Sequence, residues 1–255
     1  MDGDAPTEAT RRVAVGVWKG LAVDRSWMID ELAYAGPEHL EPGFVENYDR
    51  KQGHPPVDAD LQVLRERGAL TRESTVVDLA AGTGRFALAA AAHCRRVVAV
   101  DVSAPMLGHL RTAAAAAGAS TLECVRAGFL TYEHQGSQAD AVFCRNALHQ
   151  LPDFWKGIAL HRVAQVLRPG GVLRLHDLVY DFTPAEATDT LEQWMSGAVD
   201  DPTVGYTRDD FATHVRTEFS TYSWLLERLI VEAGFEIVER QVRAQIYAAY
   251  TCVRP

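Results

Sequence analysis

The sequence predicts an α/β protein with a doubly wound, mostly parallel sheet and a helical cap at its N-terminal end. Two observations predict this class. From Ser74 onward, short apolar runs alternate with helical stretches, which is the pattern of βαβ units with helices on both faces of one sheet. Before Ser74, apolar residues recur at helical spacing without a strand pattern. The 255 residues, 47% of them apolar, suffice for one large core.

The N-terminal part is predicted as two stretches. Residues 1–12 are polar and acidic, and we expect a frayed tail there. Residues 13–70 are expected to form the helical cap, in which Val13 and Val17 lie on one helix face. A proline pair precedes the last helix of the cap, and Gly68 closes it.

The core is expected over residues 71–255. Each predicted strand is a short apolar run between polar residues, typical of strands buried on both faces. Five strands are expected at residues 74–80, 95–103, 121–129, 139–148 and 171–180, with helices at 82–94, 104–118 and 154–167. A helical insertion follows at about 182–234, with helices at 186–199, 207–216 and 223–234. Two closing strands, 235–243 and 244–254, should be antiparallel because their connection is short.

Composition and charge exclude several classes of protein. The net charge of −9, from 25 basic and 34 acidic residues, opposes binding to nucleic acid and favours a small-molecule partner. No run of 18 apolar residues predicts a membrane span, and the polar N-terminus is not a secretory signal. The four cysteines are scattered without metal-binding spacing, so we expect reduced thiols in a cytoplasmic protein.

A glycine-rich turn predicts the ligand-binding site. The stretch VVDLAAGTGRF places Asp78 at the end of a buried strand, then Gly82 and Gly84 ahead of a helix. Asp101 ends the next strand, about 20 residues past the glycines, where a carboxylate binds ribose hydroxyls. The sequence therefore indicates a ligand that contains a nucleoside. The spacing allows a dinucleotide, but Asp78 would repel a pyrophosphate and suits a cationic ligand better.

Four motifs together carry a resemblance to a known family. They are VVDLAAGTGRF at 76–86, the strand 97–101, ADAVFCRNALHQLPD at 139–153 and VLRPGGVLRLHDL at 166–178. The chain resembles the class I S-adenosylmethionine-dependent methyltransferases, especially the small-molecule branch with the ubiquinone and menaquinone biosynthesis methyltransferases. The resemblance implies a Rossmann-like, seven-stranded sheet of order 3-2-1-4-5-7-6 with the last strand antiparallel. It also implies S-adenosyl-L-methionine as cofactor, with S-adenosyl-L-homocysteine as product.

The same resemblance implies roles for individual residues. Asp78 and the loop with Ala80, Gly82 and Gly84 would hold the methionine end of the cofactor, and Asp101 would bind both ribose hydroxyls. The other cofactor contacts would come from Tyr48, Val102, Met106, Gly128, Phe129 and Asn146. Many relatives bind the adenine amino group with an Asp after the third strand. This chain has Ala127, Gly128 and Phe129 there, so backbone groups or Phe129 would have to serve.

The catalytic candidates follow from the reaction that the resemblance implies. Methyl transfer is an in-line displacement, for which a protein aligns donor and acceptor and excludes water. His149, after the fourth predicted strand, is the candidate base because imidazole titrates near neutral pH; it could instead orient loops. Asp177, at the end of the fifth strand, is the second candidate. No metal is predicted, because Asp177 and Asp181 alone do not form a carboxylate cluster.

The sequence leaves alternatives for the function and for the substrate open. One alternative is a relative that keeps the cofactor for another reaction or binds it without catalysis. A nicotinamide-dependent oxidoreductase is a second alternative. The absence of an NPPY-type motif after the fourth strand argues against a nucleobase as acceptor. The cap and the insertion flank the predicted site, so together they could form a lid over an apolar substrate. The sequence identifies neither the acceptor nor the oligomeric state.

Overall fold

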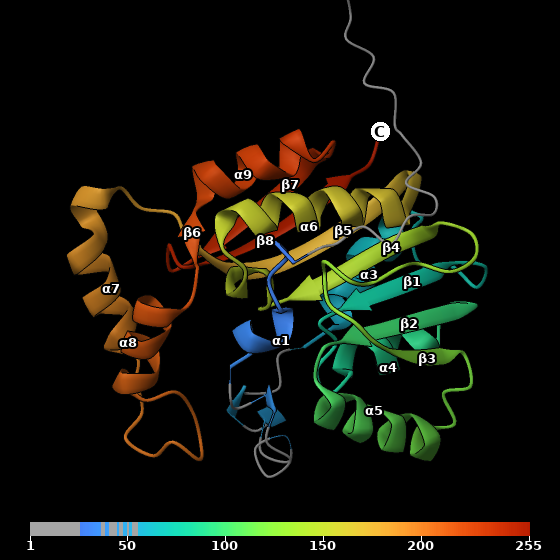
Figure 1. Ribbon diagram of the computed structural model, residues 1–255, viewed down its shortest axis with the longest axis horizontal. Coiled ribbons are helices and arrows are strands. Elements are labelled where there is room, and N and C mark those ends of the chain that lie inside the picture. The colour runs from blue at the N-terminus through green and yellow to red at the C-terminus, as the bar shows by residue number, and fades with distance from the viewer. Residues whose placement is uncertain (1–25, 37–38, 41–44, 46–47, 50, 53–55) are drawn as a thin grey trace, which may run out of the picture.

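The fold is one mixed sheet with helices on both faces (Figure 1). The computed structural model describes residues 26–36, 39–40, 45, 48–49, 51–52 and 56–255. In this part of the chain the strands follow the order β3-β2-β1-β4-β5-β8-β7, and β6 pairs with β5. Their bounds are β1 Thr75–Leu79, β2 Arg96–Asp101, β3 Leu122–Arg126, β4 Ala139–Arg145, β5 Leu167–Tyr180, β6 Thr221–Tyr222, β7 Glu236–Arg243 and β8 Tyr247–Val253.

The predicted α/β class and the mostly parallel sheet are confirmed, with a correction to strand count and order. The described sheet has eight strands where seven were predicted. The additional strand is β6, two residues long, which pairs in parallel with the end of β5 and shifts the numbers of the last two strands. Strand β8 runs antiparallel to both β5 and β7, as predicted for the last strand.

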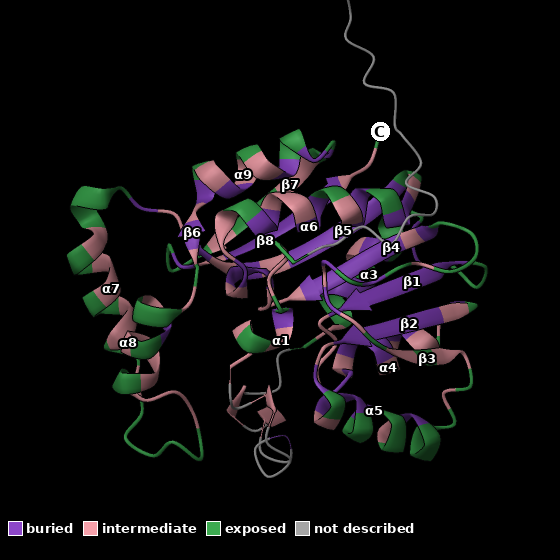
Figure 2. Cartoon of the chain, in the orientation of Figure 1, coloured by how far each residue is buried: buried purple, intermediate pink, exposed green. Residues whose placement is uncertain are grey.

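The helices form two layers, one on each face of the sheet (Figure 1). Helices α3, α4 and α5 cover one face, and α6 and α9 cover the other. The bounds are α3 Asp58–Glu66, α4 Arg85–Ala91, α5 Ala104–Ala117, α6 Asp153–Val166 and α9 Ser223–Glu232. The inner strands, such as β1, β2 and β4, are the buried centre of the molecule in Figure 2, because apolar side chains pack on both of their faces.

Local sequence explains where individual elements begin and end. Helix α5 begins after Ser103, whose hydroxyl accepts the Met106 N–H at 3.2 Å, and ends at Gly118 with φ +63°. Strand β5 begins at Leu167, four residues before the predicted start. The turn-like Pro-Gly-Gly sequence is joined to the sheet because Gly170, with φ +73°, donates its N–H to the carbonyl oxygen of Arg254 at 2.7 Å; the register against β4 shifts at this point.

The cap and the insertion lie at the carboxyl edge of the sheet. Helix α1 (Glu31–Tyr34) lies between that edge and the pair α7 (Ala187–Met195) and α8 (Arg208–Thr217) (Figure 1). Helix α7 has no buried residue and is shorter than predicted. The predicted tail and the first predicted helix of the cap lie outside the described residues, so the division into tail, cap and core stays a prediction. In the described part of the chain, no helix is long and apolar enough to cross a membrane.

Candidate active site

The glycine-rich turn after β1 adopts backbone conformations that open space for a ligand. Ala80 and Gly82 have φ values of +58° and +54°, and Asn146, just past β4, has +52°. Left-handed conformations of this kind at non-glycine residues concentrate at functional sites. Glycine is needed at position 84 for a different reason. A Cβ there would lie 2.0 Å from Leu110 Cδ1, so only glycine lets α4 pack against α5.

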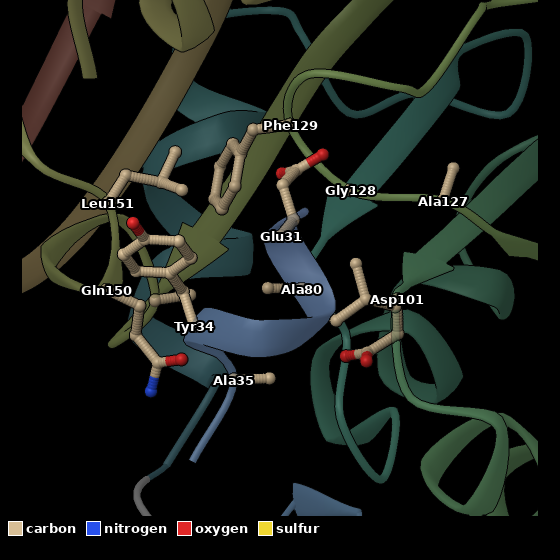
Figure 3. A pocket seen from close by; sticks show the side chains of 12 residues that line it. Glu31, Tyr34, Ala35, Ala80, Asp101, Ala127, Gly128, Phe129, Gln150 and Leu151 are labelled. Atoms are coloured by element: carbon tan, nitrogen blue, oxygen red, sulfur yellow. The ribbon is translucent and has the colours of Figure 1, made fainter. Parts of the chain in front are cut away.

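The first pocket, which we name the Asp101 pocket, has an empty volume of about 410 Å³ (Figure 3). Asp101 is buried at the end of β2, and its two carboxylate oxygens accept the N–H groups of Gly82 and Ser103, each at 2.8 Å. These bonds hold the carboxylate in the pocket wall. The pocket is lined by Glu31, Tyr34, Ala35, Ala80, Asp101, Val102, Ala127, Gly128, Phe129, Ala147, Gln150 and Leu151.

Glu31 brings a carboxylate to the position where the sequence lacks an acid after β3. It is buried and accepts the Leu130 N–H at 3.0 Å. Burial raises the pKa of Glu31 above its usual value, although the backbone N–H groups that it accepts act in the opposite direction. A Cβ on Gly128 would lie 2.3 Å from Glu31 Oε1, so the glycine makes room for this carboxylate. Figure 3 shows Glu31 and Phe129 on the same wall of the pocket.

The second pocket, which we name the Arg145 pocket, has an empty volume of about 580 Å³ and combines an acid with arginines. Burial raises the pKa of Asp78 to about 8, and the charge of nearby Asp101 adds to this rise. Arg145 Nε is buried and has no hydrogen-bond partner among the described residues. The lining residues are Tyr48, Asp49, Gln52, Val57, Asp78, Ala80, Ala81, Gly82, Thr83, Arg85, Phe86, Phe143, Arg145 and Asn146.

The two pockets meet at Ala80, which lines both, and residues of the predicted cap close over them. The Thr83 hydroxyl of the glycine loop donates to Asp49 at 2.7 Å. Gln52 donates to the Tyr206 hydroxyl at 2.6 Å. Lys51 forms an ion pair with Asp210, the first-turn acid of α8, at 3.1 Å. The described part of the predicted cap therefore contacts both the glycine-rich turn and the insertion.

The two predicted catalytic residues lie together beside the Asp101 pocket, outside the lining of both pockets. Neither His149 nor Asp177 belongs to the described lining of either pocket. His149 lies in the short helix η2 (Leu148–Gln150), where its Nδ1 contacts Asp177 Oδ1 and its Nε2 lies 2.9 Å from Glu218 Oε2. Burial opposes a charge on His149, but the carboxylates of Asp177 and Glu218 raise its pKa to about 9. Since both ring nitrogens face carboxylates, neither is directed at a pocket. The predicted catalytic role of this pair stays a prediction.

Most of the predicted cofactor residues come together. Tyr48, Asp78, Ala80, Gly82 and Asn146 line the Arg145 pocket; Ala80, Asp101, Val102, Gly128 and Phe129 line the Asp101 pocket. Two do not line either pocket: Met106 is 1% exposed in the core, and Gly84 is the N-terminal cap of α4. Their predicted roles as ligand contacts stay predictions.

Sequence reasoning missed several residues that line the pockets, among them Glu31, Arg85 and Arg145. Glu31 gave no signal, because it lies about 100 residues before the segment that it contacts. Arg85 directly follows the glycine turn, and Arg145 ends the fourth predicted strand, so both lie at positions where ligands bind in a parallel sheet. The signal for both is their position: each is a cationic residue that ends or follows a strand, either β1, which contains Asp78, or its neighbour β4.

Comparison with known families identifies the enzyme class. Residues 76–171 match the family model described as a methyltransferase domain, which spans the glycine turn, Asp101 and η2. This stretch of the chain is therefore a methyltransferase domain. The predictions of an S-adenosylmethionine-dependent methyltransferase and of S-adenosylmethionine as its cofactor are confirmed.

Solved structures share the fold at low sequence identity. Magnesium protoporphyrin IX methyltransferase from Synechocystis PCC 6803, with bound S-adenosylmethionine, has a TM-score of 0.61 and 16% identity, covering 89% of this chain and 99% of its own. The CcbJ methyltransferase from Streptomyces caelestis has a TM-score of 0.58 and 19% identity, covering 79% and 97%. The [4+2]-cyclase SpnF has a TM-score of 0.58 and 16% identity, covering 78% and 81%. At these identities the likeness extends to the fold alone.

Proposed function

We propose that this enzyme methylates a small molecule and binds its cofactor across both pockets. One observation carries the proposal: two pockets of different chemistry meet at Ala80 on the carboxyl edge of the sheet. The Asp101 pocket offers a carboxylate and apolar walls, which suit a ribose and an adenine. The Arg145 pocket offers an acid and guanidinium groups, which suit the ammonium and the carboxylate of an amino acid.

Two features of the chain fit S-adenosylmethionine. Arg145 Nε is a buried donor without a hydrogen-bond partner in the described part of the chain. A ligand carboxylate would accept its hydrogen bond. At Gly82, a Cβ would have only Tyr48 Cε1 within 4 Å, at 3.9 Å, so the missing side chain leaves room for a ligand beside the loop. When bound, the cofactor supplies an activated methyl group on a sulfonium sulfur.

The residues of the chain would bind and orient the cofactor and would shield the reacting atoms from water. Asp101 would accept hydrogen bonds from ribose hydroxyls, and Arg145 would donate to the amino-acid carboxylate. Asp78 would face the ammonium group, which favours the ionised form of this carboxyl. Glu31 would stand beside the adenine, in place of the acid that is absent after β3. The cap, held by Asp49 and Lys51, would exclude water from the reacting atoms.

A small acceptor is supported by the charge of the chain and by the structural neighbours. The net charge of −9 disfavours a polyanionic acceptor. The magnesium protoporphyrin and mitomycin methyltransferases among the structural neighbours are named for small-molecule acceptors. The closer resemblance to the ubiquinone and menaquinone branch stays a prediction.

Calorimetric titration with S-adenosylhomocysteine, with NAD as the control ligand, tests the proposed binding mode. We expect micromolar binding of the first and none of the second. Asp101→Ala should weaken the binding of S-adenosylhomocysteine by about 1.5–3 kcal/mol, the range for a hydrogen bond to a charged group. Asp140→Ala is the control, because Asp140 lies at the opposite end of the sheet, where it pairs with Arg168. Unchanged affinity in Asp101→Ala would mean that another residue holds the ribose.

A further inference from the structure

A compact cluster of imidazole and carboxylate groups lies next to the cofactor site without forming part of it. It consists of His149, His214 and Glu218, with Asp177 behind His149. Glu218 Oε2 lies 2.9 Å from His149 Nε2 and 2.7 Å from His214 Nδ1. One ligand-type atom from each of the three residues lies within 4.8 Å of the other two. The three side chains therefore converge on one point.

One ring nitrogen of each imidazole already has a partner outside these three residues. The other ring nitrogen of each, His149 Nε2 and His214 Nδ1, is therefore directed at that point. His149 Nδ1 contacts Asp177 Oδ1, and His214 Nε2 lies 2.8 Å from the Ser220 hydroxyl. Metal-binding histidines almost always use the second ring nitrogen in this way, to a carboxylate or another oxygen, which fixes the tautomer and the ring orientation. Such partners on both rings distinguish this cluster from a chance meeting of polar side chains.

The cluster combines carboxylates and imidazoles, which are ligand types for a cation. Asp177 and Glu218 bring two carboxylates into a region where Asp177, His149 and His214 are all buried. Among the described residues, neither carboxylate forms an ion pair with a Lys or Arg; their ion-pair partners are His149 and His214. Buried charges in proteins are paired or coordinate metals.

We propose that His149, His214 and Glu218 bind a divalent transition-metal ion such as Zn²⁺, with Asp177 and Ser220 as positioning residues. Two imidazoles and one carboxylate are a common ligand set for such ions and leave a fourth position for water. A tetrahedral ion with bonds of about 2.0–2.2 Å separates its ligand atoms by about 3.3–3.6 Å. The two close carboxylate–imidazole pairs would therefore have to open by less than about 1 Å.

The site would connect the insertion to the wall of the cofactor pocket. His149 belongs to η2, whose neighbours Gln150 and Leu151 line the Asp101 pocket, while His214 and Glu218 belong to α8 and its C-terminal end. The two segments are joined already, since Phe219 N–H donates to the His149 carbonyl oxygen at 2.8 Å. A bound ion would fix α8 against the core at the place where Tyr34 packs on Phe219.

Metal binding to the untagged, full-length protein tests the proposal. After dialysis against a chelator, the protein is equilibrated with Zn²⁺ or Co²⁺, and bound metal is measured by mass spectrometry. We expect one equivalent in the wild type and a loss of binding in His214→Gln and Glu218→Gln. The matched controls His161→Gln and Glu232→Gln alter exposed residues on α6 and α9 and should keep the full equivalent. Asp177→Asn should weaken binding by about 10–100-fold, as expected for a positioning residue.

Two further measurements separate metal binding from folding and from cofactor binding. Zn²⁺ at 100 times its dissociation constant should raise the thermal midpoint of the wild type, because it would stabilise the native state by about 2.7 kcal/mol; it should not raise that of Glu218→Gln. S-adenosylhomocysteine titration in the chelator reports the cofactor site separately. Absence of metal from the wild type, or an equivalent retained in both ligand variants, would show an ion-pair cluster only and overturn the proposal.

Discussion

His176 and Asp177 are neighbours on β5, yet they belong to two charged clusters of opposite character. On the α3 side, the buried carboxylate of Asp60 forms ion pairs with Arg174 at 2.9 Å and with Arg145 at 2.5 Å, and it contacts His176. On the other side, Asp177 contacts His149 in the cluster that also holds His214 and Glu218. Alternation of side chains along a strand separates the two clusters.

The difference between the two clusters lies in which charge is in excess. In direct contact, the Asp60 cluster has one carboxylate for two guanidinium groups, and one guanidinium nitrogen, Arg145 Nε, is left for an anion. The Asp177 cluster has two carboxylates and two imidazoles, which suits a cation. Strand β5 thus contributes to two clusters that could each bind a further group. The first cluster suits an anion and the second a cation. We expect the anion on the first side to be the amino-acid carboxylate of the cofactor.

The largest effect should come from removing the acid of the first cluster. Asp60→Ala leaves Arg174, 3% exposed, without its carboxylate partner, and an unpaired buried charge costs about 3–5 kcal/mol. Urea unfolding should show this loss in the free energy of unfolding. Glu66→Ala, at an exposed position of the same helix, should change it by less than about 0.5 kcal/mol. A loss below 1 kcal/mol for Asp60→Ala would mean that the arginines find other partners or water.

A smaller, ligand-specific effect should come from Arg145. Arg145→Gln should weaken the binding of S-adenosylhomocysteine by about 1.5–3 kcal/mol, because it removes a charged donor to the carboxylate. Binding of 5′-methylthioadenosine, which lacks the amino-acid group, should hardly change. Calorimetric titration of both ligands against both proteins measures this difference. Equal losses for the two ligands would show that the substitution distorts the pocket and that Arg145 does not recognise the carboxylate.

The pH dependence of binding tests whether Asp78 in the Arg145 pocket faces the ligand ammonium group. In the free protein, burial raises the pKa of Asp78 to about 8, with Asp101 and Arg145 as the charged groups nearby. Since a ligand ammonium favours the carboxylate form, binding should release a proton. The affinity for S-adenosylhomocysteine should therefore rise from pH 6 to pH 7.5, by at most about tenfold per pH unit. Asp78→Asn should remove the slope, and 5′-methylthioadenosine should show none with the wild type. A flat profile for S-adenosylhomocysteine would place its ammonium elsewhere.

Local sequence signals were sufficient for the central sheet and for the glycine-rich turn. Alternating strands and helices predicted β1 to β5 within a few residues, because short-range apolar patterns and caps determine where these elements start and end. The glycine turn and Asp101 were predicted for the same reason, since their spacing is local. Strand β6 was missed because two residues cannot show a period. The early start of β5 was missed because the partner that joins this segment to the sheet, Arg254, lies far along the chain.

By itself, the sequence determined the fold class, the glycine-rich turn and the enzyme class, because each rests on residues close together in the chain. Only the tertiary structure decided what surrounds them. It brings Glu31 to the gap beside Gly128 and Asp60 to Arg145. It also brings His214 and Glu218 to His149, across more than 60 residues. Side chains so far apart in sequence show no pattern together, and their contacts exist only once the sheet, the cap and the insertion have packed.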